Sequence, residues 1–501
     1  MLSRKIAVEE AGAERPLTPT YARRGLTSPI PRYRMPDEPM APSAAYRLIH
    51  DELALDGTPE LNLATFVTTW MDEEADRLMA ECANKNAIDW DEYPQTVELQ
   101  DRCVNMLARL FHAPEEAASV GTATVGSSEA IHLAGLAMKW RWRKARQAAG
   151  LPDDRPNLVM GANVQVCWEK FARYFDVEPR YVPLTDRRFI IGVDEAMAMV
   201  DERTIGVVGI LGSTYTGQYE PIADLERALD LVCDRQGWDV PLHVDAASGG
   251  FVAPFRQPDL AWDFRVGRVR SINVSGHKYG LVYPGVGWVV WREQSDLPEE
   301  LVFSVDYLGG THANFGLNFS RGAAQIVAQY YNLIRLGRQG YREVMTALGD
   351  TARWLADQVE GMGCFELLGR GDDLPVVCFR LTGHPAYTVF DLSEMLRQRG
   401  WIVPAYKMAP DAEDVEVLRV VVREGLSTDM ATELVADLGN AVAHLEATSG
   451  GSGSATGTPG PTAGVHRGDA KPAGAPGGRG GRRGRPPVRP PDGRTKTRAV
   501  C

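Results

Sequence analysis

Short apolar runs alternate along the chain with longer amphipathic stretches. The runs are rich in β-branched side chains and lie at 157–160, 205–211, 241–244, 271–274 and 287–291. Unbroken apolar character over a few residues is typical of strands that a sheet buries on both faces. Between the runs, apolar spacing predicts helices at 128–149 and 225–235. Strands and helices that alternate in this way predict an α/β domain with a large, mostly parallel sheet.

A second, smaller α+β unit is expected toward the C-terminus, after a long helix at 323–336. Its expected strands are 376–381, 401–405 and 416–422, and its expected helices are 388–399 and 428–445. The chain has 501 residues, which exceeds the ~250–300 that one hydrophobic core supports. We expect an N-terminal segment at 1–60, a large domain at 61–347, a small domain at 348–447 and a tail at 448–501.

The tail differs in composition from the rest of the chain. It consists mainly of Gly, Pro, Ser and Arg, which cannot bury enough apolar surface to form a core, so disorder is predicted. It carries ten Lys/Arg against two Asp, a charge of +8. Because the whole chain carries −12, residues 1–447 carry −20.

Overall composition is that of a soluble globular protein, with 44% hydrophobic and 24% charged residues. Charged residues begin at Arg4 and Lys5, before any apolar stretch, which argues against a secretory signal. No apolar run approaches the ~18 residues of a membrane span. The seven cysteines show no CxxC spacing, so we expect reduced thiols, no metal site and a cytoplasmic location.

The segment 271–280 ends a buried strand with Ser275, Gly276, His277 and Lys278. A lysine in a desolvated pocket loses its proton more readily, and the neutral amine can attack an aldehyde to form a Schiff base. A lone lysine is more often a solvated surface charge. The functional interpretation therefore depends on what accompanies it.

A second buried strand ends at Asp245 and is followed by Ala246, Ala247, Ser248 and Gly249. Small residues allow a flat ring to approach the backbone, and a buried carboxylate needs a cationic partner. The protonated ring nitrogen of pyridoxal phosphate would be such a partner. An isolated aspartate at a strand end is more often a turn former.

A third segment, 125–130, places Ser127 and Ser128 where a short strand meets the long helix. A helix N-terminus suits a phosphate group, although Ser followed by Glu129 is also an ordinary helix start. The three segments follow one another in the order expected of a fold-type I pyridoxal-phosphate enzyme. As a set they are far more specific than any one alone.

Over roughly residues 25–447 the chain closely resembles the glutamate decarboxylases of the bacterial and plant type. Besides the Asp245 and Lys278 segments, the resemblance rests on Asn62-Leu63-Ala64-Thr65-Phe66, Asn84-Lys85-Asn86, Asp91-Glu92-Tyr93-Pro94, Gly126-Ser127-Ser128-Glu129-Ala130, Thr214-Tyr215-Thr216-Gly217, Asn318-Phe319-Ser320-Arg321 and Val420-Val421-Val422-Arg423-Glu424. It implies a fold-type I enzyme that converts L-glutamate to γ-aminobutyrate and CO₂ with pyridoxal 5′-phosphate. It also implies a homodimer or higher homo-oligomer with shared active sites.

The resemblance also implies individual roles. Lys278 would bond to the cofactor, Asp245 would pair with its ring nitrogen, and His277 or Lys278 would return the proton to the substrate. The other cofactor contacts would be Gln165 and Ala247 on the two ring faces, Thr214 at the ring hydroxyl, and Ser127, Ser128, Ser275, His277 and a neighbouring subunit's Ser320 at the phosphate. Arg423 would bind the substrate α-carboxylate, and the distal carboxylate would lie among Thr65, Phe66, Asn86 and Asp89.

Two other functions remain open at this point. A decarboxylase for aspartate or an aromatic amino acid would carry similar residues around Lys278, and only the pocket with Thr65, Phe66, Asn86 and Asp89 would distinguish it. A polyanion-binding protein could act through the basic tail, but the tail has no aromatics for base stacking and the body is acidic, which disfavours nucleic acid. The tail also lacks the apolar helical face that calmodulin binds, so no calmodulin partner is expected.

Overall fold

The computed structural model describes residues 31–116, 118–305, 312–383 and 385–449. Residue contacts divide the chain into two compact units, Met1–Leu61 and Asn62–Cys501. In the first unit, helix α1 (Pro42–Leu53) begins with a proline at its first position, where the missing N–H costs nothing. A short 3-10 helix follows at Pro59–Leu61. Residues 450–501, most of the expected tail, lie outside the described residues.

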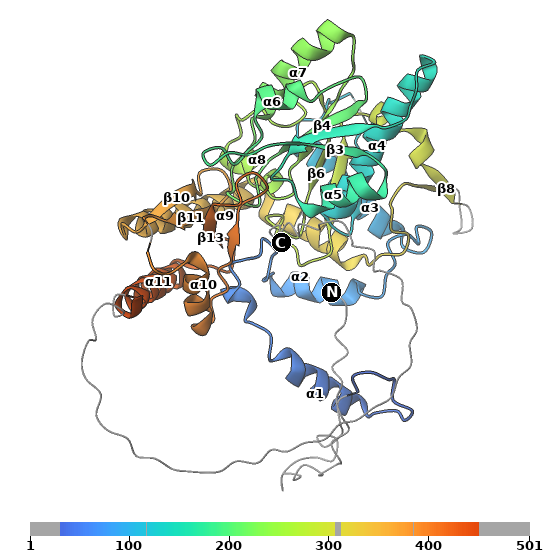
Figure 1. Cartoon of the computed structure of the whole chain (residues 1–501). Coiled ribbons are helices and arrows are strands. Elements are labelled where there is room, and N and C mark those ends of the chain that lie inside the picture. Colours follow the sequence, from blue (N-terminus) through green and yellow to red (C-terminus); the bar gives the residue numbers. More distant parts are fainter. Residues whose placement is uncertain (1–30, 117, 306–311, 384, 450–501) are drawn as a thin grey trace, which may run out of the picture. The chain divides into compact units, whose positions relative to one another are not determined.

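The second unit is built on a seven-stranded sheet of order β1-β7-β6-β5-β4-β2-β3 (Figure 1). Its strands are β1 (Val120–Thr124), β2 (Asn157–Gly161), β3 (Glu178–Val182), β4 (Thr204–Ile210), β5 (Leu242–Asp245), β6 (Val269–Val274) and β7 (Gly287–Trp291). Neighbours pair in parallel, except that β7 is antiparallel to both β6 and β1. The expected α/β architecture with a mostly parallel sheet is confirmed.

Helices cover both faces of this sheet, with α4 (Ser127–Ala148) and α5 (Val166–Tyr174) on one face and α7 (Ile222–Gln236) on the other. Two glycines of β4 show the arrangement. A Cβ on Gly206 would lie 2.4 Å from Sδ of Met138 in α4, and one on Gly209 would lie 2.2 Å from Cδ1 of Ile222 in α7. Every residue of β4 is buried, which explains its unbroken apolar sequence.

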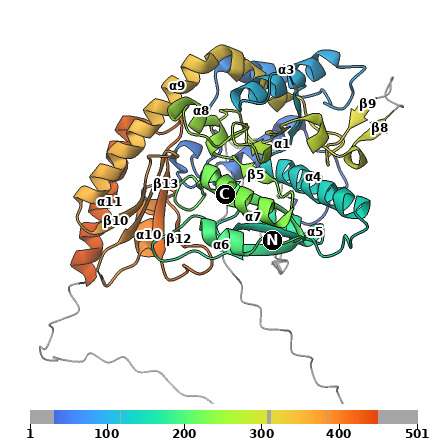
Figure 2. The same ribbon diagram turned by 90° about the horizontal axis from the view of Figure 1, so that it is seen from above.

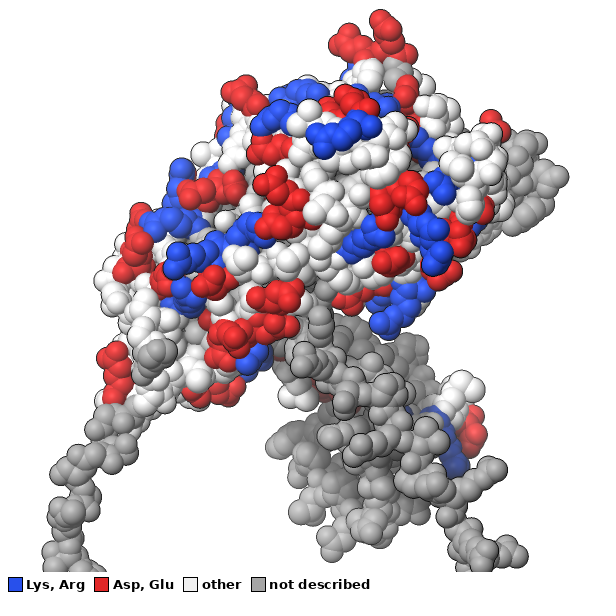
Figure 3. Space-filling view, turned by 45° about the horizontal axis from the view of Figure 1, so that its top comes forward, with Lys and Arg blue, Asp and Glu red and all other residues white. Residues whose placement is uncertain are grey.

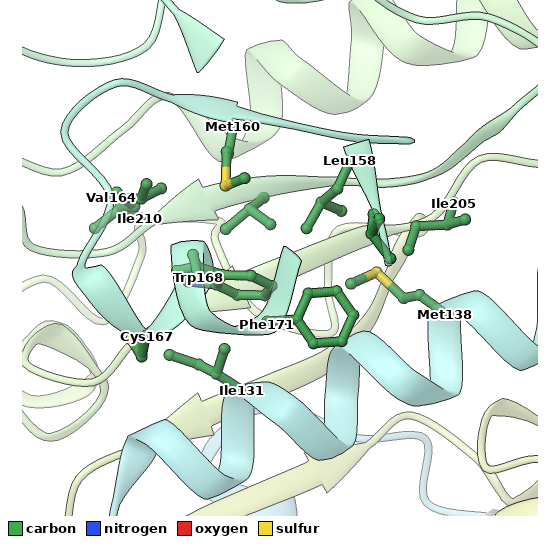
Figure 4. Close-up of a cluster of buried hydrophobic side chains, with 12 residues drawn as sticks. Ile131, Met138, Leu158, Met160, Val164, Cys167, Trp168, Phe171, Ile205 and Ile210 are labelled. Atoms are coloured by element: carbon green, nitrogen blue, oxygen red, sulfur yellow. The ribbon is translucent and has the colours of Figure 1, made fainter. Parts of the chain in front are cut away.

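The core between the sheet and the α4–α5 face contains large side chains in close contact. Figure 4 shows Trp168 and Phe171 of α5 lying against Leu158 and Met160 of β2. Trp168 and Phe171 are fully buried and meet edge to face, with ring centroids 6.0 Å apart. Packing of these two rings against β2 anchors α5 over the sheet and places its first residues at the sheet edge.

Further helices and a strand pair belong to the large domain. They are α2 (Glu73–Cys82), α3 (Pro94–Leu110), α6 (Val193–Ala198), α8 (Ala253–Arg256), and the strand pair β8 (Phe303–Val305) and β9 (His312–Asn314). Helices α2, α3 and α8 pack against α9 (Ala324–Gly361). Within the described residues, no helix combines the length and the apolar character needed to cross a membrane.

A four-stranded antiparallel sheet of order β10-β11-β13-β12 forms the smaller α+β part. Its elements are β10 (Phe365–Arg370), β11 (Val376–Leu381), α10 (Val389–Gln398), β12 (Ala405–Lys407), β13 (Glu416–Val421) and α11 (Thr428–Ser449). Helix α9 (Ala324–Gly361) packs against α3 near one end and against β10, β11 and α11 near the other (Figure 2).

The structure departs from the sequence expectations in two of these elements. Helix α9 is kinked at a non-helical Gly337 (φ 57°), where the helix expected at 323–336 ends, but a second helical stretch continues to Gly361, so the expected boundary at 347/348 falls inside α9. The strand expected at 401–405 is wrong, because pairing with β13 begins only at Ala405 and Ile402 makes only an isolated bridge to Asn62. Trp401 and Val403 are apolar because they are buried, and the Trp401 N–H bonds to Leu396 at the end of α10.

Candidate functional site

The C-terminal ends of β1, β2, β4, β5 and β6 meet at one edge of the large sheet, where parallel α/β sheets bind ligands. A cavity of about 600 Å³ lies there. Eight of the residues singled out from the sequence line it: Ser127, Ser128, Gln165, Asp245, Ala247, Ser275, His277 and Lys278. Sheet topology therefore brings together segments that are up to 150 residues apart.

Lys278 lies four residues beyond the end of β6 and is only 7% exposed. Its Nζ donates to Ser248 Oγ at 3.2 Å and lies 5.2 Å from the centre of the Phe66 ring. Thr68 fixes the backbone by donating its hydroxyl to the Lys278 carbonyl at 2.8 Å. The turn requires Gly276, because a Cβ there would lie 2.3 Å from Gln329 Oε1. The result is a buried amine held by one hydroxyl and an aromatic face, as a Schiff-base lysine requires.

Asp245 ends β5 and is 5% exposed. Its Oδ2 accepts a hydrogen bond from the Trp168 indole at 2.9 Å, and its Oδ1 accepts from the Asn273 amide at 2.9 Å and the Ala247 N–H at 3.2 Å. All of these partners within the described chain are neutral. A buried carboxylate with neutral partners at a cavity wall is suited to a cationic ring nitrogen.

A phosphate cradle is formed where α4 begins. Ser127 is the first residue of this 22-residue helix, and its hydroxyl lies 2.7 Å from that of Ser275. His277 Nδ1 is buried, and the described residues offer it no hydrogen-bond partner. Burial, with the Lys278 charge second, lowers the pKa of His277 to about 4, so the ring is neutral near pH 7. Two hydroxyls, an unpaired ring nitrogen and a helix N-terminus fit the phosphate of pyridoxal phosphate.

Gln165 and Thr214 are joined at the same edge. Gln165 is the N-cap of α5, where its Oε1 accepts from the Val166 N–H at 3.2 Å. Its Nε2 donates to Thr214 Oγ1, also at 3.2 Å. Gln165 lines the cavity, whereas Thr214 does not and is connected to it through this hydrogen bond to Gln165.

Arg423 and Phe66 lie on the small-domain side of Lys278. Arg423 follows β13 by two residues, is 1% exposed, and donates to the Asn62 carbonyl at 2.9 Å and to Thr69 Oγ1. The Phe66 ring lies close to both Lys278 Nζ and the Arg419 guanidinium, whose carbon is 5.0 Å from the ring centre. Thr65 accepts from the Val67 N–H at 3.1 Å.

Asn86, Asp89 and Ser320 form a separate group that does not line this cavity. Asn86 Nδ2 donates to Asp89 Oδ1 at 3.1 Å and to Ser320 Oγ at 3.4 Å. The backbone of Ala87 and Arg321 holds the two segments together with a 2.8 Å hydrogen bond. Within one chain, these three residues therefore lie together but do not line the cavity that contains Lys278.

Sequence reasoning missed four residues that the structure places around the central pair: Thr68, Trp168, Ser248 and Asn273. Asn273 could have been found, because it is two residues before Ser275 on a buried strand that neighbours the Asp245 strand. Trp168 gave no signal, because a tryptophan on an amphipathic helix is ordinarily a core residue.

Comparisons with known proteins identify the family of the chain. Residues 31–382 match the pyridoxal-dependent decarboxylase conserved domain. The chain is 54% identical to a glutamate decarboxylase of Solanum lycopersicum over 436 residues, 87% of each chain. It is 50% identical to a glutamate decarboxylase of Aliivibrio fischeri, covering 84% of this chain and 91% of that protein. The solved structure of a Lactobacillus brevis glutamate decarboxylase superposes with a TM-score of 0.83 at 46% identity, covering 86% of this chain and 98% of that one.

Proposed function

The chain belongs to the pyridoxal-dependent decarboxylase family and, within it, to the glutamate decarboxylases, and on that premise we propose that it converts L-glutamate to γ-aminobutyrate and CO₂. Its cofactor is pyridoxal 5′-phosphate. The observation that carries the proposal is the pair of Lys278 and Asp245 on one cavity, an amine and a carboxylate with only neutral partners in the described chain.

The bound cofactor supplies the electron sink for loss of the α-carboxylate. Lys278 provides the amine that holds the cofactor aldehyde, and Asp245 pairs with the ring nitrogen. Arg423 clamps the α-carboxylate and thereby orients the bond that breaks. His277, which burial keeps neutral near pH 7, or Lys278 would return a proton to the substrate. Burial of Lys278 and Arg423 keeps water away from this step.

The pocket for the distal carboxylate is proposed to combine two subunits. Thr65 and Phe66 lie in the segment beside Lys278, whereas Asn86 and Asp89 belong to the separate group with Ser320. Exposed apolar side chains lie close to that group in sequence, with Phe319 37% exposed and Leu317, which also lines the cavity, 46% exposed. If a second copy covered them, Ser320 of this chain would reach the phosphate cradle of that copy. Asn86 of this chain would likewise reach the substrate bound to that copy. We therefore propose a homodimer or higher homo-oligomer with shared active sites.

Two rival functions make different predictions. An aspartate or aromatic decarboxylase would need a shorter or an apolar pocket in place of Asn86 and Asp89. A polyanion-binding function would rest on the tail, because Figure 3 shows Lys and Arg interspersed with Asp and Glu over the described part of the face that it draws. Mixed charge of this kind provides no extended basic surface for a polyanion.

We also propose a cytoplasmic location. Six of the seven cysteines lie in the described chain, and all six are free thiols, which suits a reducing compartment.

The deciding experiment is to supply the purified protein with pyridoxal phosphate and then, separately, with glutamate, aspartate and tyrosine. We expect a visible absorbance band from the lysine-bound cofactor, and amine product from glutamate alone. Aspartate is the matched control, since it differs from glutamate by one methylene. Product from aspartate or tyrosine at a comparable rate would overturn the substrate assignment.

A further inference from the structure

Asp245 is one end of a chain of buried hydrogen bonds that crosses strands β5 and β6. Asn273 Nδ2 lies 2.9 Å from Asp245 Oδ1, Asn273 Oδ1 lies 2.7 Å from His243 Nε2, and His243 Nδ1 lies 2.7 Å from Ser271 Oγ. His243 and Asn273 are 0% exposed and Ser271 is 1% exposed. The parallel register pairs Asp245 with Asn273 and His243 with Ser271, so all four side chains share one face.

Only one assignment of protons gives every hydrogen bond in this row of side chains both a donor and an acceptor. An ionised carboxylate accepts but cannot donate, so Asn273 must present its NH₂ group to Asp245. The Asn273 carbonyl oxygen then faces His243, and His243 Nε2 must carry the hydrogen. His243 Nδ1 is left to accept from the Ser271 hydroxyl. Burial lowers the pKa of His243, which keeps the ring in this neutral form.

The second carboxylate oxygen is held from the opposite side. The Trp168 indole donates to Asp245 Oδ2, and Trp168 is fixed in the core shown in Figure 4. The same indole lies edge to face on His243, with centroids 5.3 Å apart and planes at 64°. Both oxygens of Asp245 therefore have a donor on a rigid element, and the orientation of the carboxylate at the cavity wall is determined.

We propose that His243 is a positioning residue that acts on the cofactor through Asn273 and Asp245. Its Nε2–H fixes the amide of Asn273, and that amide aims the Asp245 carboxylate at the ring nitrogen of pyridoxal phosphate. Neither His243 nor Asn273 lines the cavity. The inference rests on the cofactor-binding part of the proposed function and is independent of which amino acid is the substrate.

The test compares two cofactors in wild type and in His243→Phe, which keeps a ring of similar size but has no donor. One cofactor is pyridoxal phosphate, and the other is its analogue with CH in place of the ring nitrogen. We expect His243→Phe to weaken the binding of pyridoxal phosphate about fivefold, the typical effect of losing one hydrogen bond between neutral groups. The analogue cannot pair with Asp245, so its affinity should change little.

Two further variants sharpen the comparison. His243→Gln retains a donor toward Asn273 and should restore most of the affinity for pyridoxal phosphate. Val244→Ala is the matched packing control, because Val244 is fully buried on the opposite face of β5. It should change the affinities for the two cofactors by the same factor.

Equal weakening of both cofactors by His243→Phe would show a packing role and overturn the proposal, as would failure of His243→Gln to restore affinity. Should the phenylalanine variant not fold, His243→Leu removes the same donor toward Asn273 and must show the same selectivity. In the active protein, the kcat of His243→Phe should fall while KM for glutamate stays constant, because Asp245 acts on the cofactor rather than the substrate. Because cofactor affinity is measured directly, a failure of the His243 proposal can be distinguished from a failure of the proposed glutamate decarboxylation.

Discussion

Replacing Glu220 with glutamine should remove a pH dependence from the stability of the protein. Glu220 is 3% exposed and accepts three hydrogen bonds, from the Ile210 N–H at 2.7 Å, the Ile191 N–H at 3.0 Å and the Asn163 amide at 3.0 Å. Burial outweighs these donors and raises the pKa of Glu220 to about 7. The charge on Asp245 acts in the same direction.

The magnitude follows from the pKa shift. A rise from 4.5 to about 7 corresponds to about 3 kcal/mol of free energy of unfolding. Between these pH values the folded chain holds a proton that the unfolded chain has released. The contribution is therefore fully present below pH 4.5 and is lost as the pH rises through about 7. Glutamine does not titrate, so the Glu220→Gln variant lacks this slope.

The assay is urea unfolding of the cofactor-free wild type and variant, followed by tryptophan fluorescence from about pH 5 to about pH 8. Relative to the variant, the wild type should lose about 2 to 3 kcal/mol across this range. The glutamine side chain has only one oxygen, so its NH₂ group faces at least one of the three donors. The stability lost in this way is the same at every pH. Glu433→Gln, at an exposed position of α11, is the matched control and should leave the slope unchanged. Parallel curves for wild type and Glu220→Gln would refute the reasoning.

Four further outcomes are expected. Lys278→Ala should abolish both turnover and the borohydride-reducible cofactor linkage, and a label found on another lysine in the wild type would contradict this. Verified heterodimers of Lys278→Ala and Ser320→Tyr subunits should recover some activity, since one hybrid site is intact; no recovery would count against a shared site. Asp89→Asn should flatten the pH dependence of apparent glutamate affinity, because two ionised carboxylates in one pocket repel, and an unchanged profile would exclude this placement. A chain ending at Ala447 should keep the cofactor and most of its turnover, since attraction between the tail and the body is screened within about 8 Å; a severe loss would show that the tail reaches the active site.

The ends of the buried strands were readable from the sequence because burial on both faces leaves an unbroken apolar run. Strands β2, β4, β5, β6 and β7 were all located within three residues of their observed ends. The edge strand β3 was missed, because Glu178, Pro179 and Arg180 give it a polar sequence. The false strand at 401–405 arose because burial, rather than sheet pairing, makes Trp401 and Val403 apolar.

By itself, the sequence determined the sheet class, the family and the residues that a pyridoxal-phosphate site needs. Each of these depends on short contiguous segments of the chain. Lys278 and Asp245 could be singled out in this way, and their roles stay predictions. Only the tertiary structure decided what surrounds them. The hydrogen bonds from Trp168 and Asn273 to Asp245 depend on β5 lying beside β6 and on α5 packing over the sheet, which no local pattern encodes. Likewise, the separation of Asn86 and Ser320 from the cavity of their own chain follows from how distant segments pair.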